Sequence, residues 1–332
     1  MSLSRWSLGI MRLGERCRSC HRLHRQSLPM TRPSRSNWWS VASVILAAVL
    51  LSGCATSMGE PTPAIAARNP SDDLRERAAM ALETRRAAQA KQLYGSILSD
   101  SPDDPEALMG VGEAEVLLGE YGPALDHSRK AAELAGERAP LKARALHNAG
   151  IALLLTNRAA AAERELEAAV ESDPTSWRAW SALGRARDAR QAWEEAGAAY
   201  EQALALAPDE GAVLNNFGMS KLSAGDHAGA GALFIRALEA SPDLAAAEIN
   251  LRLALALGGR YQDALAGVDA QAMPDALNNA GYAALLRGDY AQARSLFLQA
   301  IDASPDFYEP ARSNLRFLDS LEARQSFPEE AP

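Results

Sequence analysis

The stretch WRAWSALGRARDARQAWEEAGAAYEQALALAPDE, residues 177–210, decides the fold of this chain. Small residues such as Ala196 alternate with large ones such as Tyr200 at helical spacing, and Pro208 closes the stretch. The same order of small and large residues returns 34 residues later, and again from residue 274. A period of this length, with two helical patterns inside it, predicts a stack of antiparallel helix pairs.

The pattern resembles the tetratricopeptide repeat (TPR), whose units of 34 residues fold as helix–turn–helix pairs. The resemblance implies an all-α fold, a TPR α-solenoid that winds into a right-handed superhelix and ends in a C-terminal capping helix. We expect the TPR domain to span residues 71–325. Its predicted units are 71–104, 105–142, 143–176, 177–210, 211–244, 245–273 and 274–307, with the cap at 308–325.

The repeated positions predict how each pair of helices packs. Glycine in the first helix and alanine in the second let two backbones approach closely, and one aromatic per unit should fill the space beside them and pack on the next unit. Gly-Asp or Gly-Glu pairs predict the turns between helices, and prolines predict where second helices stop. The positions are Gly184, Gly218, Gly281; Ala196, Ala230, Ala293; Tyr200, Phe234, Phe297; pairs 119–120, 225–226, 288–289; and Pro102, Pro174, Pro208, Pro242, Pro305.

Three units depart from this pattern. The unit from 105 lacks its closing proline and has four extra residues, Ala139–Lys142, which predict a longer second helix or a looser turn. The unit from 245 has only 29 residues, so we expect its second helix to lose about one turn and the stack to bend there. In the first unit, Arg85 stands where the interhelix glycine belongs, which makes that unit the weakest match.

The charge of the chain is unevenly distributed. Residues 1–53 carry eight Arg and one Glu, so the remainder has a net charge of −15 within a total of −8. An acidic domain is a poor partner for nucleic acid. All three cysteines precede residue 55, so no disulfide is available to the repeats, which must be stabilised by packing.

The segment before the repeats predicts export and lipidation. From Met30 it has the charged start and the apolar run, Trp38–Leu51, of a signal peptide within residues 1–53. The run has 14 residues, which is short for a membrane-spanning helix of about 20. Leu51-Ser52-Gly53-Cys54 resembles the bacterial lipobox, which implies cleavage before Cys54 and a covalent lipid on its thiol. A free cysteine behind an inner-membrane anchor is the alternative.

The sequence also gives expectations for the residues on either side of the predicted signal peptide and for the C-terminal tail. Ala55 follows the cysteine where enteric lipoproteins kept at the inner membrane have Asp, which suggests the outer membrane. Residues 54–70, rich in proline, should form a flexible tether, and residues 326–332 a disordered tail. Residues 1–29 fit no signal peptide, and we interpret them as an upstream extension. The haem-attachment spacing CRSCH at 17–21 and a zinc site there are chance matches, because they precede the cleavage point.

No enzyme motif is found in the repeats, and we expect neither catalysis, nor a metal, nor a cofactor apart from the lipid. His127, His147 and His227 fall on different helices, which is typical of structural or surface histidines. Of Trp177, Trp180 and Trp193, two occur at offsets where TPR units place core aromatics, so packing is favoured over a small-molecule site. A nucleic acid or a small-molecule substrate is therefore not among the expected partners.

Asparagine at the sixth position of successive first helices is the one feature beyond packing. In TPR folds this position lines the concave groove, where amides can hold the backbone of an extended peptide. The alternative is that these amides serve helix entry or a solvated surface. The groove is predicted to be basic toward the third and fourth units, which suits an acidic or mixed-charge peptide. Its candidate residues are Arg144, His147, Asn148, Arg178, Arg185, Asn215, Asn216, Met219, Asn250, Asn278, Asn279 and Tyr282, with Asn314 equivalent in the cap.

Lipobox and repeats together resemble the TadD family of lipoproteins for tight-adherence (Flp) pilus assembly. The resemblance rests on Leu214-Asn215-Asn216-Phe217-Gly218 and on the run from Ile249 to Arg260, and covers roughly residues 70–320. It implies a non-catalytic scaffold at the periplasmic face of the outer membrane, with a secretin or other pilus machinery as partner. Type IV pilus secretin pilotins, adaptors of cell-wall hydrolases and regulatory subunits of a separate enzyme remain alternatives. The two-carboxylate clamp that grips chaperone tails is not found.

Overall fold

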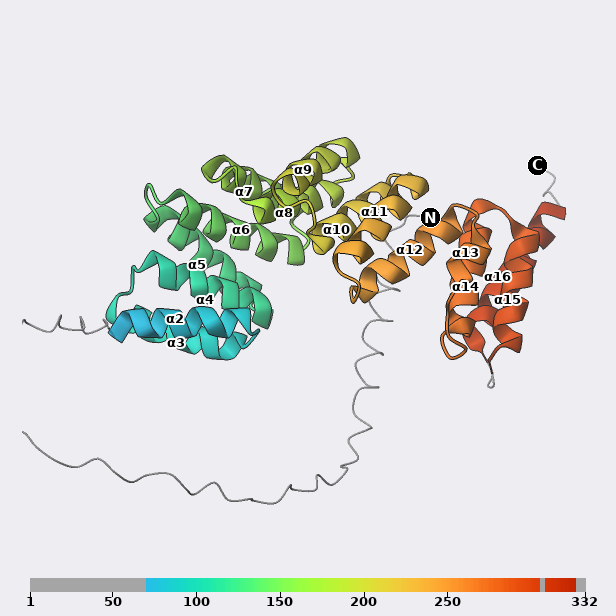
Figure 1. Cartoon of the computed structure of the whole chain (residues 1–332), viewed down its shortest axis with the longest axis horizontal. Helices are drawn as coiled ribbons and strands as arrows, with labels where there is room; N and C mark the ends of the chain where they lie inside the picture. Colours follow the sequence, from blue (N-terminus) through green and yellow to red (C-terminus); the bar gives the residue numbers. More distant parts are fainter. Residues whose placement is uncertain (1–69, 305–307, 327–332) are drawn as a thin grey trace, which may run out of the picture. The chain divides into compact units, whose positions relative to one another are not determined.

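The computed structural model describes residues 70–304 and 308–326. The described residues form fifteen α-helices and no strand, which confirms the all-α prediction (Figure 1). The helices are α2 Pro70–Glu83, α3 Ala87–Asp100, α4 Pro105–Leu118, α5 Tyr121–Leu134, α6 Ala139–Leu155, α7 Ala159–Ser172, α8 Trp177–Asp188, α9 Trp193–Leu206, α10 Gly211–Ser223, α11 His227–Ala240, α12 Ala245–Leu257, α13 Tyr261–Leu265, α14 Met273–Arg287, α15 Tyr290–Asp302 and α16 Glu309–Ser326.

The helices are paired along the chain, and each pair packs on the next. Even-numbered helices from α2 to α14 are the first helices of the units, odd-numbered helices are the second, and α16 covers the end. None of the described helices has the length and apolar character needed to cross a bilayer. The predicted signal peptide at 1–53, the lipid site Cys54, the tether up to residue 69, Pro305 and the tail from 327 lie outside the described residues.

The turns between paired helices use the left-handed backbone conformation. Gly119, Gly225 and Gly288 have φ values of 81°, 87° and 81°, as predicted from the Gly-Asp and Gly-Glu pairs. Asn157 and Gln191 occupy the same place in their units with φ of 59° and 61°. Arg85 adopts φ of 56° in the first unit. The turn geometry is therefore kept even where glycine is missing.

The predicted close contact between paired helices is present and involves the large side chain directly. A Cβ atom added at Gly218 of α10 would lie 2.5 Å from the ring of Phe234 on α11, and one at Gly184 of α8 would lie 2.8 Å from Tyr200 on α9. Both rings are completely buried. Tyr200 also stacks on Phe217 of the next first helix, with ring centroids 5.4 Å apart. Tyr200 thus joins its own helix pair to the next one.

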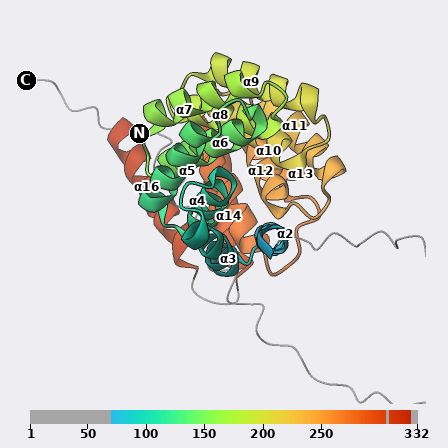
Figure 2. The same ribbon diagram turned by 90° about the vertical axis from the view of Figure 1, so that its left-hand side faces the viewer.

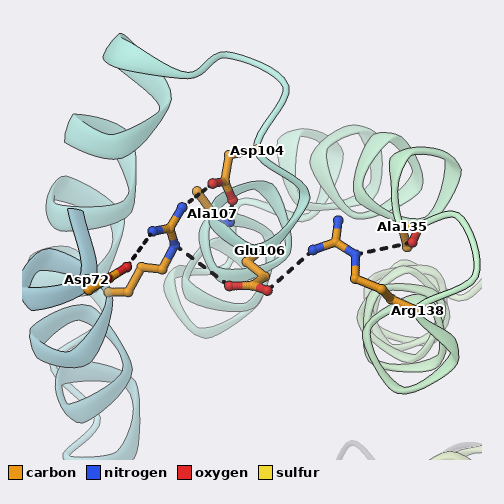
Figure 3. A network of polar contacts seen from close by, with 7 residues as sticks. Asp72, Asp104, Glu106, Ala107, Ala135 and Arg138 are labelled. Carbon is orange, nitrogen blue, oxygen red and sulfur yellow. Dashed lines mark hydrogen bonds and ion pairs between the residues drawn. The ribbon is translucent and has the colours of Figure 1, made fainter. Parts of the chain in front are cut away.

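A charged network ties the first two units together and reaches Arg138, the residue just before α6, as Figure 3 shows. Arg75 of α2 forms ion pairs with Asp72 and with Asp104, which caps α4 by accepting a hydrogen bond from the backbone of Ala107. Glu106 lies 3.7 Å from Arg75 on one side and 3.4 Å from Arg138 on the other. The first unit, whose sequence pattern is weak, is therefore held by polar contacts as well as by its core.

The four extra residues of the second unit lie in a different element from the one predicted. α5 ends at Leu134, and Ala139–Lys142 form the first turn of α6 instead of extending α5. Pro140 occupies this first turn, where its missing N–H costs no helical hydrogen bond. Of the two predicted outcomes, a longer second helix or a looser turn, the longer second helix is wrong, because the extra residues lengthen α6.

The short unit from 245 loses more of its second helix than predicted. α13 has only five residues, compared with 14 in α11, so well over one turn is missing. Arg252 of α12 stands at the position of Gly184 and Gly218. Its guanidinium donates hydrogen bonds of 2.9 Å to the carbonyls of Ala264 and Ala266, at the end of α13. A long polar side chain therefore stands where the units from 177, 211 and 274 have a glycine–aromatic contact.

Candidate peptide-binding face

The first helices form one continuous side of the stack. Each first helix packs against the next first helix along the whole described domain, whereas consecutive second helices make no comparable contact in that part of the chain. In the view of Figure 2, α6, α8 and α10 accordingly lie inward of α7, α9 and α11. The side formed by the first helices is thus the concave one.

We call the residues displayed on this side the first-helix face. It consists of the second, fifth and ninth residues of the units that begin at 105, 143, 177, 211, 245 and 274. All of them are exposed or half-buried except Met109 and Ser181, so most of these side chains remain accessible to solvent. In the central units the face carries Arg144, His147, Arg178, Arg185, Asn215, Met219, Ile249, Leu253, Asn278 and Tyr282.

The structure joins several of the predicted asparagines across neighbouring first helices. Asn250 of α12 donates a hydrogen bond of 2.9 Å to Asn215 of α10, and Asn314 of α16 donates one of 2.9 Å to Asn278 of α14. An amide has two donors and two acceptor lone pairs, so each of these side chains keeps capacity for a further bond. Part of the predicted groove is therefore a ladder of amide pairs between helices.

The sixth-position residues differ in their exposure. Asn279 is exposed and Asn216 is half-buried, whereas Asn148 is buried, with 7% of its surface accessible. The Nδ2 atom of Asn148 has no hydrogen-bond partner among the described residues. Its Oδ1 lies 3.4 Å from Nδ1 of His147, so the amide sits directly beside that imidazole.

A basic cluster occupies the first-helix face at the third and fourth units. Burial, as the largest cause, and the positive charges of Arg185, Arg178 and Arg144 together lower the pKa of His147 to about 4. A hydrogen bond with the neighbouring amide of Asn148 acts in the opposite direction. Burial and the three guanidinium charges, from α6 and α8, therefore keep this imidazole neutral near pH 7.

The arginines of α8 and of the turn that follows it fall into two classes. Arg187 pairs with Glu163 and Glu167 of α7, at 3.3 Å each, and Arg190 also pairs with Glu163. Arg178 and Arg185, on the first-helix face, have no carboxylate within ion-pair distance among the described residues; Arg178 stacks on the ring of Trp177 at 4.3 Å.

The third arginine of the cluster is partly neutralised. Arg144 lies 3.1 Å from Glu113 of α4, which is the ninth residue of the preceding unit. Positive charge is therefore uncompensated mainly along α8.

An apolar patch follows on the next units. Ile249 of α12 is 56% exposed. Met219 of α10 and Leu253 of α12 are half-buried and pack on the same small cluster around Phe234. We had not predicted Ile249 and Leu253 as face residues, although they are the fifth and ninth residues of their unit. That spacing was the signal that could have found them.

Histidines and buried carboxylates elsewhere serve the structure. Glu115 of α4, only 1% exposed, pairs with Lys91 of α3 at 3.0 Å and with His127 of α5 at 2.8 Å. Asp188 accepts hydrogen bonds of 2.7 Å from Tyr200 and 2.6 Å from Ser220, and burial raises the pKa of this carboxyl. These contacts join consecutive units.

Metal chemistry finds no candidate site either. The described residues contain no group of three His, Cys, Asp or Glu side chains that could hold a metal ion.

Trp180 behaves as a packing residue. Its indole donates a hydrogen bond of 2.9 Å to the carbonyl of Pro174, and its ring packs on the core of the third and fourth units. Trp177 packs on the neighbouring core around Tyr200. Both rings are thus used within the stack.

Comparison with known proteins agrees with this geometry. The tetratricopeptide-repeat family matches residues 76–143, 147–211 and 268–306. The chain belongs to this family. TPR domains are protein–protein interaction scaffolds that bind protein or peptide partners and are generally not catalytic. No curated protein matches the chain.

Solved structures share the TPR fold. The C-terminal part of a TPR protein from Cytophaga hutchinsonii is 15% identical with a TM-score of 0.51, over 71% of this chain and 97% of that one. A thermophilic TPR protein from Thermus thermophilus is 22% identical with a TM-score of 0.49, over 56% and 98% of the two chains. MamA from Desulfovibrio magneticus RS-1 is 25% identical with a TM-score of 0.43, over 52% and 96%. At 15% identity, the similarity to the Cytophaga protein concerns the fold alone.

Proposed function

We propose that this protein is a non-catalytic scaffold, anchored by a lipid on Cys54 at the periplasmic face of the outer membrane, whose first-helix face binds an extended segment of a partner protein. The observation that carries the proposal is the display of polar and apolar side chains along that face. A solenoid that used its concave side only for packing would bury these positions. The amides of Asn215 and Asn278 instead keep hydrogen-bonding capacity after pairing with neighbouring helices.

The partner we propose is the assembly machinery of a tight-adherence pilus, with its secretin as the first candidate. Support comes from the lipobox-like Leu51–Cys54, from Ala55 behind it, and from the resemblance of Leu214–Gly218 and Ile249–Arg260 to the TadD family. A lipid anchor would keep the domain beside an outer-membrane channel, and the proline-rich tether would give it a reach of up to ~50 Å.

The anchor and the pilus role are tested together in the native host. Cells producing the Cys54→Ala variant are labelled with radioactive palmitate, fractionated, and examined for secretin multimers by gel electrophoresis. We expect the variant to lose the label, to leave the outer membrane and to reduce secretin multimers. Labelled variant protein would contradict lipidation of Cys54, and unchanged secretin multimers would contradict the pilus role.

The binding face is tested by replacing amides. In the triple variant Asn215→Ala, Asn250→Ala, Asn278→Ala, which removes two amides of the first-helix face and the hydrogen-bond partner of Asn215, we expect capture of the partner from detergent-solubilised membranes to fall at least tenfold, with helicity preserved. The matched control replaces Gln92, Gln202 and Gln292, exposed amides on second helices, by Ala. Equal capture by both triple variants would remove the first-helix face from the proposal.

A further inference from the structure

The basic cluster on α6 and α8 is left with unmet bonding capacity. Arg178 and Arg185 have no acidic partner among the described residues, although Arg187 of the same helix and Arg190 in the turn after it are paired with glutamates. The Nδ2 atom of Asn148, beside His147, is a buried donor without an acceptor in the described part of the chain. The unpaired buried donor of Asn148 costs free energy that an acceptor group of a ligand would recover, whereas the exposed guanidinium groups of Arg178 and Arg185 are hydrated and free to bind an anion.

The ligand that fits this cluster is a carboxylate. Guanidinium groups bind carboxylates through two parallel hydrogen bonds, and an amide N–H adds a neutral donor. The surrounding domain is strongly acidic, so the cluster is a local inversion of charge. Such an inversion selects an acidic segment at this point and repels it elsewhere, which also fixes the register of a bound chain.

The apolar patch lies two first helices further along the stack. Packed helices are about 8–10 Å apart, so the step from α8 over α10 to α12 covers roughly 20 Å. An extended polypeptide advances ~3.3 Å per residue, so about six residues connect the two places. The 56% exposed Ile249, with Met219 and Leu253 beside it, offers contact to an aliphatic side chain.

We propose that the partner segment carries an acidic side chain that binds between Arg178 and Arg185 beside Asn148, and an aliphatic side chain about six residues away that packs on Met219, Ile249 and Leu253. This inference rests on the proposed function and specifies the chemistry of the segment bound on the same face. On this proposal, the first-helix face recognises an acidic side chain at one site and an aliphatic side chain at a second site, a fixed distance away.

The test uses synthetic peptides and the full-length lipidated protein in detergent. The probe is a fluorescein-labelled peptide, Glu-Glu-Ser-Gly-Ser-Gly-Ser-Leu-Leu-amide, measured by fluorescence anisotropy. Comparison peptides carry Gln-Gln in place of Glu-Glu, Ser-Ser in place of Leu-Leu, a spacer shortened to two residues, or phosphoserine in place of each Glu. We expect the probe to bind at least tenfold more tightly than each comparison peptide, with an affinity that falls as NaCl rises.

Protein variants localise the two contacts. We expect Arg178→Gln and Arg185→Gln each to weaken probe binding about tenfold or more, because each removes a charge-assisted hydrogen bond. Ile249→Ser should weaken binding of the probe but not of the Ser-Ser peptide. Arg164→Gln and Arg236→Gln, exposed on the second helices α7 and α11, are the matched controls and should change binding less than twofold. Circular dichroism melting of each variant checks that the stack remains folded.

Several outcomes would overturn the inference. Equal binding of the Glu and Gln peptides, an unchanged affinity of the folded double variant Arg178→Gln, Arg185→Gln, or preference for the phosphoserine peptide would each contradict the carboxylate site. Equal binding of the short-spacer peptide would contradict the two-point geometry. If the peptides fail in these ways while the native partner is still captured through the first-helix face, only this inference falls; if the face captures no partner, the proposed function falls with it.

Discussion

Three non-glycine residues at the turns between paired helices adopt a left-handed backbone conformation that glycine adopts most easily. Arg85, Asn157 and Gln191 have φ between 56° and 61°, where the Cβ atom of an L-residue crowds the carbonyl oxygen. Asparagine tolerates this region better than arginine or glutamine. The three units concerned therefore carry strain that Gly119, Gly225 and Gly288 avoid in theirs.

Relief of this strain is a direct prediction at the residue scale. We expect Gln191→Gly to raise the free energy of unfolding by about 1 kcal/mol, because glycine adopts positive φ without the steric penalty. Gly225→Ala, at φ of 87°, should lower it by a similar amount. Urea denaturation followed by circular dichroism measures both. Loss of stability in Gln191→Gly would show that the side chain of Gln191 contributes more than its strained backbone costs.

Close packing at the helix crossing gives a second prediction. Gly218→Ala would place a methyl group against the ring of Phe234, so we expect a net loss of ~1–2 kcal/mol, partly offset by the better helix propensity of alanine. Gly95→Ala in α3 has no atom within 4 Å of the new methyl group and should gain about 0.5–1 kcal/mol. Equal effects of the two substitutions in chemical denaturation would contradict the packing account.

The basic cluster predicts an unusual titration. The pKa of His147 lies at about 4 in the folded chain and at its ordinary value of 6.5 in the unfolded chain. The unfolded chain therefore binds more protons between these values, and this residue makes stability decline as the pH falls from 6.5 to 4, by ~1–3 kcal/mol. NMR titration of the imidazole should show the low pKa, and Arg185→Gln should raise the pKa of His147. A pKa near 6.5 that is insensitive to Arg185→Gln would contradict the cluster.

Prediction from sequence was most successful for the residues with a steric role. Gly184, Gly218 and their aromatic partners follow from the period because only small residues fit at a close crossing. Hydrogen bonds on the first-helix face could not be predicted in the same way. Whether Asn250 reaches Asn215, or Asn148 becomes buried, depends on the exact offset between consecutive first helices, which the period leaves open.

At the scale of single helices, α13 shows how the chain accommodates a missing segment. Its five residues are too few to form a stable helix alone. Arg252 stabilises the end of α13 by donating to the carbonyls of Ala264 and Ala266, and its other nitrogen pairs with Glu248 at 2.8 Å. The guanidinium thereby satisfies acceptors that the lost turns would have used.

Removal of this contact should loosen one element. We expect Arg252→Gln to speed amide exchange across residues 261–268 by at least tenfold while leaving α10 and α11 unchanged, as measured by hydrogen exchange and mass spectrometry. Arg260→Gln is the control, since Arg260 is 65% exposed and its ion pair with Asp263 should contribute little. Equal protection of this segment in Arg252→Gln and the native protein would mean that α13 does not depend on Arg252.

The insertion after α5 shows the limit of repeat counting for helix boundaries. The period located the four extra residues but not the helix that receives them. Pro140 carried the missing information, because proline fits the first turn of a helix and disrupts its interior. Giving weight to that residue would have assigned Ala139–Lys142 to α6, as the structure has it.

Across the whole domain, the first-helix face changes character from one end to the other. Glu106 and Glu113 stand on α4, arginines on α6 and α8, and apolar side chains on α10 and α12. A partner bound along this face would meet these zones in order, which gives the complex a defined direction. The central claim is therefore that the partner lies on the first helices and not on the second.

Site-specific photo-cross-linking tests this claim most directly. A benzophenone amino acid is introduced in the native host at Arg185, at Met219, or at the second-helix controls Arg164 and Arg236, and cross-linked products are identified by mass spectrometry. The account predicts one partner segment cross-linked from both first-helix positions, with its acidic residues nearest position 185, and none from the controls. Cross-links of the native partner from Arg164 or Arg236, with none from Arg185 or Met219, would contradict it.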